Sequence, residues 1–208
     1  ARAAVPGDLE SVLKTLPKFG HPMDWLSVGI HTLGMMETTN DWKDDALNLI
    51  ARMPRLMGLI FRIREGREEN IPADDTSLSM VERFIRCLDL HDANTEKMKR
   101  IISTYLVLHM DHGGGNLSTF AGKAIASSKA TVYSAMAGAM NALSGPLHGR
   151  ANQSCLEFVL KVGTSDPAEV EAFVRAELAA NRPIFGFGHA VLRSEDPRAT
   201  VQFELGSQ

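Results

Sequence analysis

The sequence predicts an all-α fold. Hydrophobic residues make up 44% of the 208 positions and recur mainly three and four positions apart, the spacing of one face of a helix. Runs in which β-branched residues alternate with polar residues, the pattern of strands, are few. The segments between the helical runs carry capping residues, prolines and glycines. Together these observations predict a series of consecutive helices.

The N-terminal part is expected to hold four helices. Asp8 can cap the first, and Pro22 suits the first turn of the second. Pro54 lies inside the third run, where it removes a backbone donor and should kink or split the helix. Ser77 can cap the fourth. The expected helices span about 8–16, 22–36, 41–64 and 77–88.

The remaining part of the chain is expected to hold six more helices. The segment 130–145 is rich in Ala, Gly and Ser, which predicts a buried helix because small residues let helices approach closely. The first of the six begins at 94 or 95 and ends at the histidines at 109 and 112, and the second begins at about 117. The next three span 130–145, 151–162 and 167–180, and the last begins at 196.

The charge balance excludes some classes of partner. Lys and Arg number 22 against 25 Asp and Glu, a formal net charge of -3, so no basic field gathers nucleic acid or anionic lipid. No apolar run of about 18 residues and no signal sequence is present. Cys87 and Cys155 lie far apart, which indicates neither a disulfide framework nor a CxxC site. We therefore expect a soluble intracellular protein without a membrane contact.

Three histidine motifs stand out at expected helix ends and glycine-rich loops. They are HMDH at 109–112, GPLHGRANQ at 145–153 and GFGHAVLRSEDPR at 186–198. Each has a structural explanation, since an imidazole can satisfy a helix C-terminus or a tight turn. In the third motif, Arg193 and Arg198 add cationic groups that pair well with carboxylate and phosphate, which indicates an anionic substrate.

A metal site is a rival interpretation of the first motif. Imidazole and carboxylate suit divalent metals, so His109, Asp111 and His112 could form the centre of a metal-dependent hydrolase. No HExxH pattern or cysteine ligand accompanies them. We therefore expect no metal, and keep the hydrolase as an alternative.

The order and spacing of the three motifs resemble the citrate synthase family, with its segments HxDHxGGN, GPLHGxANQ and GxGHAVLRxxDPR. Upstream, HPMDWL at 21–26, IARMP at 50–54 and the pattern from Arg62 to Gly66 are also similar to family segments, so the likeness covers nearly the whole chain. The AVLR and ANQ forms resemble the mitochondrial-type branch and its bacterial relatives.

The resemblance implies a function and site residues. It implies an enzyme that condenses acetyl-CoA with oxaloacetate. Acetyl-CoA is a substrate of this reaction, and no cofactor takes part. His148 corresponds to the histidine that binds the thioester oxygen, and His189 to the one that polarises the ketone. His112 and Arg198 correspond to oxaloacetate ligands. The coenzyme A region corresponds to Ile184, Phe185, Gly186, Phe187, Gly188 and Arg193.

The resemblance also implies an architecture. Residues 1–149 would be part of a large helical domain and 150–208 part of a small one, with His148 at the hinge, in a homodimer. The family's catalytic aspartate lies beyond the third motif, so the chain is expected to be an internal segment with impaired turnover. The implied location is the bacterial cytoplasm, or the mitochondrial matrix in a eukaryote. Besides the metal-dependent hydrolase, the alternatives are a 2-methylcitrate synthase using propionyl-CoA and a noncatalytic ligand-binding fragment.

Overall fold

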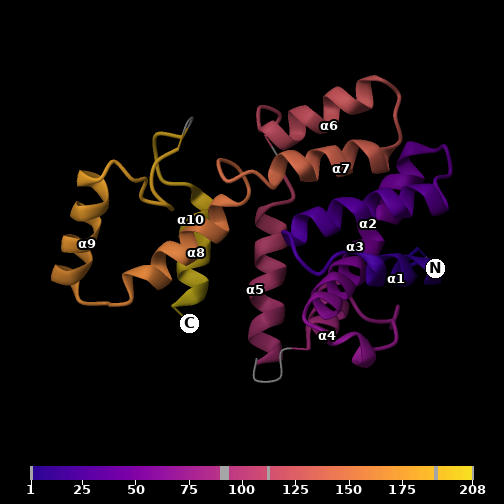
Figure 1. The fold of residues 1–208 in the computed structure, drawn as a ribbon, viewed down its shortest axis with the longest axis horizontal. Helices are drawn as coiled ribbons and strands as arrows, with labels where there is room; N and C mark the ends of the chain where they lie inside the picture. Colours follow the sequence, from indigo (N-terminus) through magenta and orange to yellow (C-terminus); the bar gives the residue numbers. More distant parts are fainter. Residues whose placement is uncertain (1, 90–93, 112, 190–191, 208) are drawn as a thin grey trace.

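The computed structural model describes residues 2–89, 94–111, 113–189 and 192–207. In these residues all regular structure is helical, which confirms the predicted fold class (Figure 1). None of these helices has both the length and the apolar character needed to cross a bilayer. The elements are α1 (Gly7–Thr15), α2 (Pro22–Glu37), α3 (Trp42–Arg64), the 3-10 helix η1 (Glu68–Asn70), α4 (Met80–Leu88), α5 (Thr95–Leu108), α6 (Leu117–Ser127), α7 (Val132–Leu143), α8 (Ala151–Val162), α9 (Pro167–Ala179) and α10 (Pro197–Gly206).

The hydrophobic core lies between α1, α2, α3 and α7. Glycines bring these helices close together: a Cβ at Gly29 would lie 2.6 Å from Leu56 Cδ1, and one at Gly34 would lie 2.6 Å from Tyr133 Cβ. Such contacts leave no room for a side chain, so helix spacing here depends on glycine. The core is made chiefly of Leu9, Leu13, Trp25, Ile30, Leu33, Leu56, Leu59, Ile63, Tyr133 and Ala137.

A buried polar network joins three of the core helices. The hydroxyl of Tyr133 on α7 donates to Glu37 Oε1 of α2 at 2.7 Å, and Arg52 Nη2 of α3 lies 2.6 Å from Glu37 Oε2. Burial and the Glu37 carboxylate raise the pKa of Tyr133 well above its ordinary value. The phenol therefore stays protonated and keeps donating to Glu37.

The segment 130–145 is a helix with one buried face. Tyr133, Ala135, Ala137 and Ala139 of α7 are buried, whereas Met136 is exposed. A Cβ at Gly138 would lie 2.1 Å from Ile125 Cδ1, so α6 packs tightly against α7. The prediction of a buried helix is thus confirmed for the face towards α2 and α6 but not for the opposite face.

The third helix was expected to kink or split at Pro54, and it does not split. The helix α3 continues from Trp42 to Arg64 with Pro54 inside it. Leu49 and Leu56, on either side of the proline, both lie in the core, and their burial offsets the lost backbone bond. In addition, Arg83 Nη1 of α4 donates to the carbonyl oxygen of Ala51 at 3.0 Å. The carbonyl that loses its partner to Pro54 is that of Ile50, so this contact ties α4 to α3 beside the proline and does not replace the lost bond.

The cap of the fourth helix was predicted at the wrong serine. Ser79 caps α4, because its Oγ accepts from the backbone N–H of Glu82 while the Glu82 carboxylate accepts from the N–H of Ser79. Ser77 instead donates its hydroxyl to Asp75 in the preceding turn. The reciprocal pair at 79 and 82 satisfies two backbone groups, which a cap at Ser77 would not do.

The helices α8, α9 and α10 lie apart from α1–α4, α6 and α7, with α5 between them (Figure 1). Among the described residues, α10 packs on α5, whereas α8 and α9 pack only slightly against the helices before residue 150. The rings of Phe158 on α8 and Phe173 on α9 meet edge to face at 5.6 Å. The described contacts thus join α8 to α9 through these two rings, whereas α10 is held on α5.

Candidate functional site

His148 lies in a tight turn between α7 and α8. The carbonyl oxygen of Gly145 accepts from the N–H groups of His148 at 3.0 Å and of Arg150 at 3.3 Å. The Arg150 side chain donates back to Ser144 O at 2.9 Å. A Cβ at Gly149 would lie 2.6 Å from Leu143 O, a backbone atom that cannot move aside. This turn therefore places His148 in a fixed position.

The His148 ring contacts the first turn of α6. Its Nε2 lies 2.9 Å from Ser118 Oγ and accepts from the backbone N–H of Ser118 at 3.3 Å. Because a backbone N–H can only donate, Nε2 carries a lone pair and the proton of the neutral ring lies on Nδ1. Ser118 was not among the residues predicted for the site, although it lies six positions after the HMDH motif at 109–112. The arrangement leaves His148 Nδ1–H as a donor.

His189 has the opposite tautomer. Its Nδ1 accepts from the backbone N–H of Leu192 at 2.9 Å, so the proton of the neutral ring lies on Nε2. Arg193 Nη1 donates to the carbonyl oxygens of His189 at 2.9 Å and of Leu192 at 3.1 Å. His189 is exposed. Arg193 therefore shapes the backbone of the loop that carries His189.

The loop before His189 is anchored by a buried carboxylate. Glu177 on α9 accepts from Arg182 Nε at 2.7 Å and Nη2 at 2.8 Å, and from Lys161 Nζ at 3.1 Å. Hydrogen bonds from Arg182, and then from Lys161, lower the pKa of Glu177 to about 2. Gly186 and Gly188 have φ values of +91° and +79°, which only glycine adopts without strain.

A hollow of about 400 Å³ brings the first and third motifs together at the C-terminal end of α5. Arg198 Nη2 lies 2.6 Å from Asp196 Oδ2, and Asp196 also caps α10. Hydrogen bonds from the Arg198 side chain and backbone lower the pKa of Asp196 to about 2. The lining residues are His109, Asp196, Arg198, Ala199, Gln202 and Phe203.

His109 closes the end of α5. Its Nδ1 lies 2.7 Å from Tyr105 O, and its ring stacks on Tyr105 with a centroid distance of 4.1 Å. His112, which was predicted to bind substrate and was part of the rival metal site, lies outside the described residues. Within the described ranges no group of three His, Cys, Asp or Glu side chains could hold a metal. His109 therefore combines a structural role with a place in the hollow beside Arg198.

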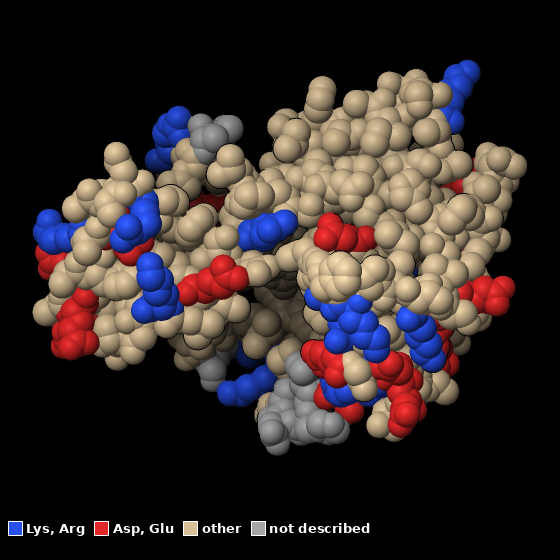
Figure 2. All heavy atoms as spheres, viewed as in Figure 1, with Lys and Arg blue, Asp and Glu red and all other residues tan. Residues whose placement is uncertain are grey.

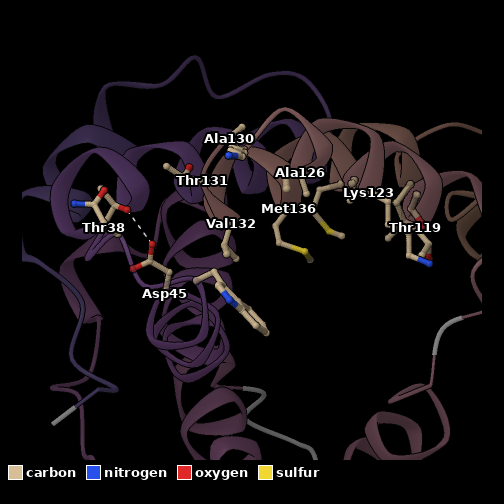
Figure 3. A pocket seen from close by; sticks show the side chains of 18 residues that line it. Thr38, Asp45, Thr119, Lys123, Ala126, Ala130, Thr131, Val132 and Met136 are labelled. Atoms are coloured by element: carbon tan, nitrogen blue, oxygen red, sulfur yellow. Dashed lines mark hydrogen bonds between the residues drawn. The ribbon is translucent and has the colours of Figure 1, made fainter.

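A larger hollow of about 790 Å³ lies along α6, α7 and the start of α3. Figure 3 shows Thr38 and Asp45 at one end, Thr119 and Lys123 at the other, and Met136 projecting into it. Its lining is mostly apolar, and it contains none of the predicted site residues. Ser118, the partner of His148, is part of its lining. This hollow thus lies next to the site and shares Ser118 with it.

The described contacts bring Arg198 to His109 and His148 to Ser118. His148 and His189 lie in separate hydrogen-bond networks, one in the turn before α8 and one in the loop before α10. The neutral rings carry their protons on different nitrogens, Nδ1 in His148 and Nε2 in His189. The arrangement therefore supplies two neutral donors and an arginine, groups suited to oxygens that gain negative charge.

The family model described as "Citrate synthase, C-terminal domain" matches residues 1–208. The chain belongs to the citrate synthase family. It is 31% identical to the mitochondrial 2-methylcitrate synthase of Yarrowia lipolytica over 99% of this chain and 48% of that protein. It is 32% identical to the mitochondrial citrate synthase 4 of Arabidopsis thaliana over 98% of this chain and 46% of that protein.

Solved citrate synthases share the fold. The enzyme of Thermotoga maritima matches with a TM-score of 0.80 and 30% identity, over 96% of this chain and 52% of that one. A ternary complex of the Thermoplasma acidophilum citrate synthase with carboxymethyl coenzyme A and oxaloacetate matches with a TM-score of 0.81 and 26% identity, over the same shares. The chain spans about half the length of these relatives. Members of the citrate synthase family are acyltransferases, the enzyme class that the sequence predicts.

Proposed function

We propose that the protein containing this chain is a citrate synthase of the tricarboxylic acid cycle. It would condense acetyl-CoA with oxaloacetate and hydrolyse citryl-CoA to citrate and coenzyme A. The observation that carries the proposal is the Ser118–His148 contact, because it leaves a neutral imidazole with a donor on Nδ1 in the GPLHG turn. Enol formation from a thioester needs such a donor at the carbonyl oxygen.

The two histidines take complementary roles in this proposal. His148 donates from Nδ1 to the thioester oxygen and stabilises the enol that forms when a methyl proton leaves. His189 donates from Nε2 to the ketone oxygen of oxaloacetate and protonates the alkoxide as the carbon–carbon bond forms. Neutral imidazoles suit both steps near pH 7. We assign no proton-abstracting base among the described residues.

Arginines bind the charged parts of the substrates. The Nε and Nη2 atoms of Arg198 pair with Asp196, so Nη1 is the group that we assign to an oxaloacetate carboxylate, together with His112. Arg193 and residues 184–188 are assigned to coenzyme A, whose phosphates suit an arginine and backbone N–H groups in a glycine-rich loop. Both ligand types are present in the Thermoplasma acidophilum complex. No cofactor is needed for this reaction.

We further propose the family's two-domain dimer. Residues 1–149 would form part of the large domain and 150–208 part of the small one, which matches the slight packing between α8–α9 and the earlier helices. The surface over α6 and α7 is almost free of charged side chains in Figure 2, and Phe120 there is 65% exposed. Such an apolar face fits a second copy of the protein. The proposed location is the bacterial cytoplasm, or the mitochondrial matrix in a eukaryote; the Yarrowia and Arabidopsis relatives are mitochondrial proteins.

The test is release of the coenzyme A thiol from acetyl-CoA in the presence and absence of oxaloacetate, with the full-length protein. We expect oxaloacetate-dependent release, and a loss of about 100-fold or more in His148→Ala. His31→Ala is the matched control, because His31 is an exposed histidine on α2 outside the motifs. No release by a verified full-length protein that still binds oxaloacetate would favour a noncatalytic binding protein. Stoichiometric zinc or manganese that survives dialysis would favour the hydrolase.

A second candidate is 2-methylcitrate synthase, favoured by the Yarrowia relative. The same residues would act on propionyl-CoA, whose extra methylene is worth only about 1–3 kcal/mol in a pocket. The ratio of kcat/KM for acetyl-CoA to that for propionyl-CoA separates the two. A ratio well below one would replace the first proposal by the second.

A further inference from the structure

Two sequence motifs that the proposed mechanism does not use meet in the structure. His21 begins the HPMDWL segment at the start of α2, and Gln153 ends the ANQ segment in the first turn of α8. His21 Nε2 lies 2.7 Å from Gln153 Oε1, across 132 positions of sequence. We call this contact the His21–Gln153 bridge. It crosses a boundary over which α8 packs only slightly.

The hydrogen-bond partners on both sides fix the direction of the bridge. His21 Nδ1 accepts from the backbone N–H of Met23 at 3.2 Å, so the neutral ring carries its proton on Nε2 and donates it to Gln153. Gln153 Nε2 donates to Glu157 Oε1 at 2.8 Å, so its Oε1 faces His21 as an acceptor. Each hydrogen bond in the series from the Met23 N–H through His21 and Gln153 to Glu157 thus has one donor and one acceptor. The bridge is therefore a directed hydrogen bond rather than a chance approach of two polar side chains.

The helix α8 in turn contacts both ends of the loop that leads to His189. A Cβ at Gly186 would lie 3.0 Å from Cys155 Sγ, so the loop backbone lies directly against α8 two positions after Gln153. At the other end of the loop, Lys161 of α8 and Arg182 share the buried Glu177 carboxylate. A rotation of α8 would therefore carry the whole loop with it.

We propose that the His21–Gln153 bridge is a positioning contact that sets the orientation of α8, and hence of the loop carrying His189, relative to α2 and the His148 turn. His21 and Gln153 touch no substrate in this proposal. They act through α8. This helix begins directly after the His148 turn, and its Cys155 lies against the loop that leads to His189. The consequence for catalysis rests on the proposed function, whereas the structural part does not.

The test is hydrogen exchange of the 208-residue chain measured by mass spectrometry. In Gln153→Ala we expect amides of 151–162 and 182–188 to exchange about three- to tenfold faster, because one inter-segment hydrogen bond is lost. His21→Asn should give the same result while α2 stays protected, since Asn also caps helices well but is too short to reach Gln153. Asn152→Ala is the control, because Asn152 is an exposed neighbour on α8 that takes no part in the bridge, and its exchange should match that of the parent.

The double variant decides whether the two residues act through one bond. We expect His21→Asn with Gln153→Ala to exchange no faster than either single variant, because both remove the same contact. Additive effects, or unchanged exchange in α8 and the loop, would overturn the proposal. So would a ¹⁵N spectrum showing His21 protonated on Nδ1 alone, since Nε2 could then not donate. None of these measurements needs turnover, so their failure is distinct from a failure of the enzymatic assignment.

Discussion

The close approach of α2 and α7 gives a quantitative prediction for Gly34→Ala. The new Cβ would lie 2.6 Å from Tyr133 Cβ and 2.9 Å from Tyr133 Cγ, whereas carbon atoms pack at about 3.5–4.0 Å. The two helices must therefore separate by about 1 Å. Tyr133 cannot turn away, because it is 1% exposed and its hydroxyl is bonded to Glu37.

The expected size follows from two opposing effects. Overpacking a core costs about 1–3 kcal/mol, and the clash here is between atoms next to two helix backbones, which favours the upper part of that range. Alanine regains about 1 kcal/mol of helix propensity over glycine. We expect a net loss of about 1–2 kcal/mol, or a Tm lower by about 2–8 °C for a chain of this size.

The assay is thermal unfolding followed by fluorescence of Trp25, which is buried in the same core. Gly7→Ala is the matched control, because a Cβ there meets nothing within 4 Å, and its Tm should stay within about 2 °C of the parent. A Gly34→Ala variant as stable as the parent, or more stable, would refute the idea that glycine sets the spacing of α2 and α7.

Two further predictions concern the candidate site. Ser118→Ala should lower kcat of the full-length enzyme by about three- to tenfold, because His148 Nε2 loses its contact with the hydroxyl group. The backbone N–H at 118 remains and still fixes the tautomer of the ring. An unchanged kcat in steady-state kinetics would remove Ser118 from the site. Glu177→Gln should lower the Tm at pH 7 by about 3 °C. The Glu177 carboxyl has a pKa of about 2 in the fold against an ordinary value of 4.5, so its stabilising contribution is present above about pH 4.5 and is lost as the pH falls towards 2. The Tm difference between variant and parent should shrink over that range, and a constant difference would contradict the ion-pair explanation.

Local patterns predicted most of the fold. Helix bounds followed from caps and breakers such as Pro22 at the start of α2 and Asp196 before α10. The predicted cap at Asp8 was wrong, because α1 begins at Gly7 after Pro6 and Asp8 lies inside its first turn. The other errors arose where two local signals competed. Ser77 and Ser79 are both capping residues, and only the pairing of Ser79 with Glu82 decides between them. At Pro54, the burial of residues far apart in sequence outweighed a local helix breaker.

Only part of the candidate site could be predicted from the sequence, because contacts between distant segments depend on how the helices pack. His148, His189 and Arg198 were found from motif resemblance, which carries residue identity but no distances. Ser118 was missed because its contact with the His148 ring depends on how α6 packs beside the turn. The pairing of Arg198 with Asp196 was accessible in principle, since the two are two positions apart at a helix start.

The contact between Arg83 and α3 has a consequence for how this sequence can vary. Arg83 donates to Ala51 O of α3 and to Ala3 O near the N-terminus, and it holds Asp74 at 2.7 Å, so one guanidinium joins three segments of the chain. Loss of Arg83 would release all three segments at once and leave the Asp74 carboxylate without its ion pair. We therefore expect positions 74 and 83 to differ together wherever either differs among relatives.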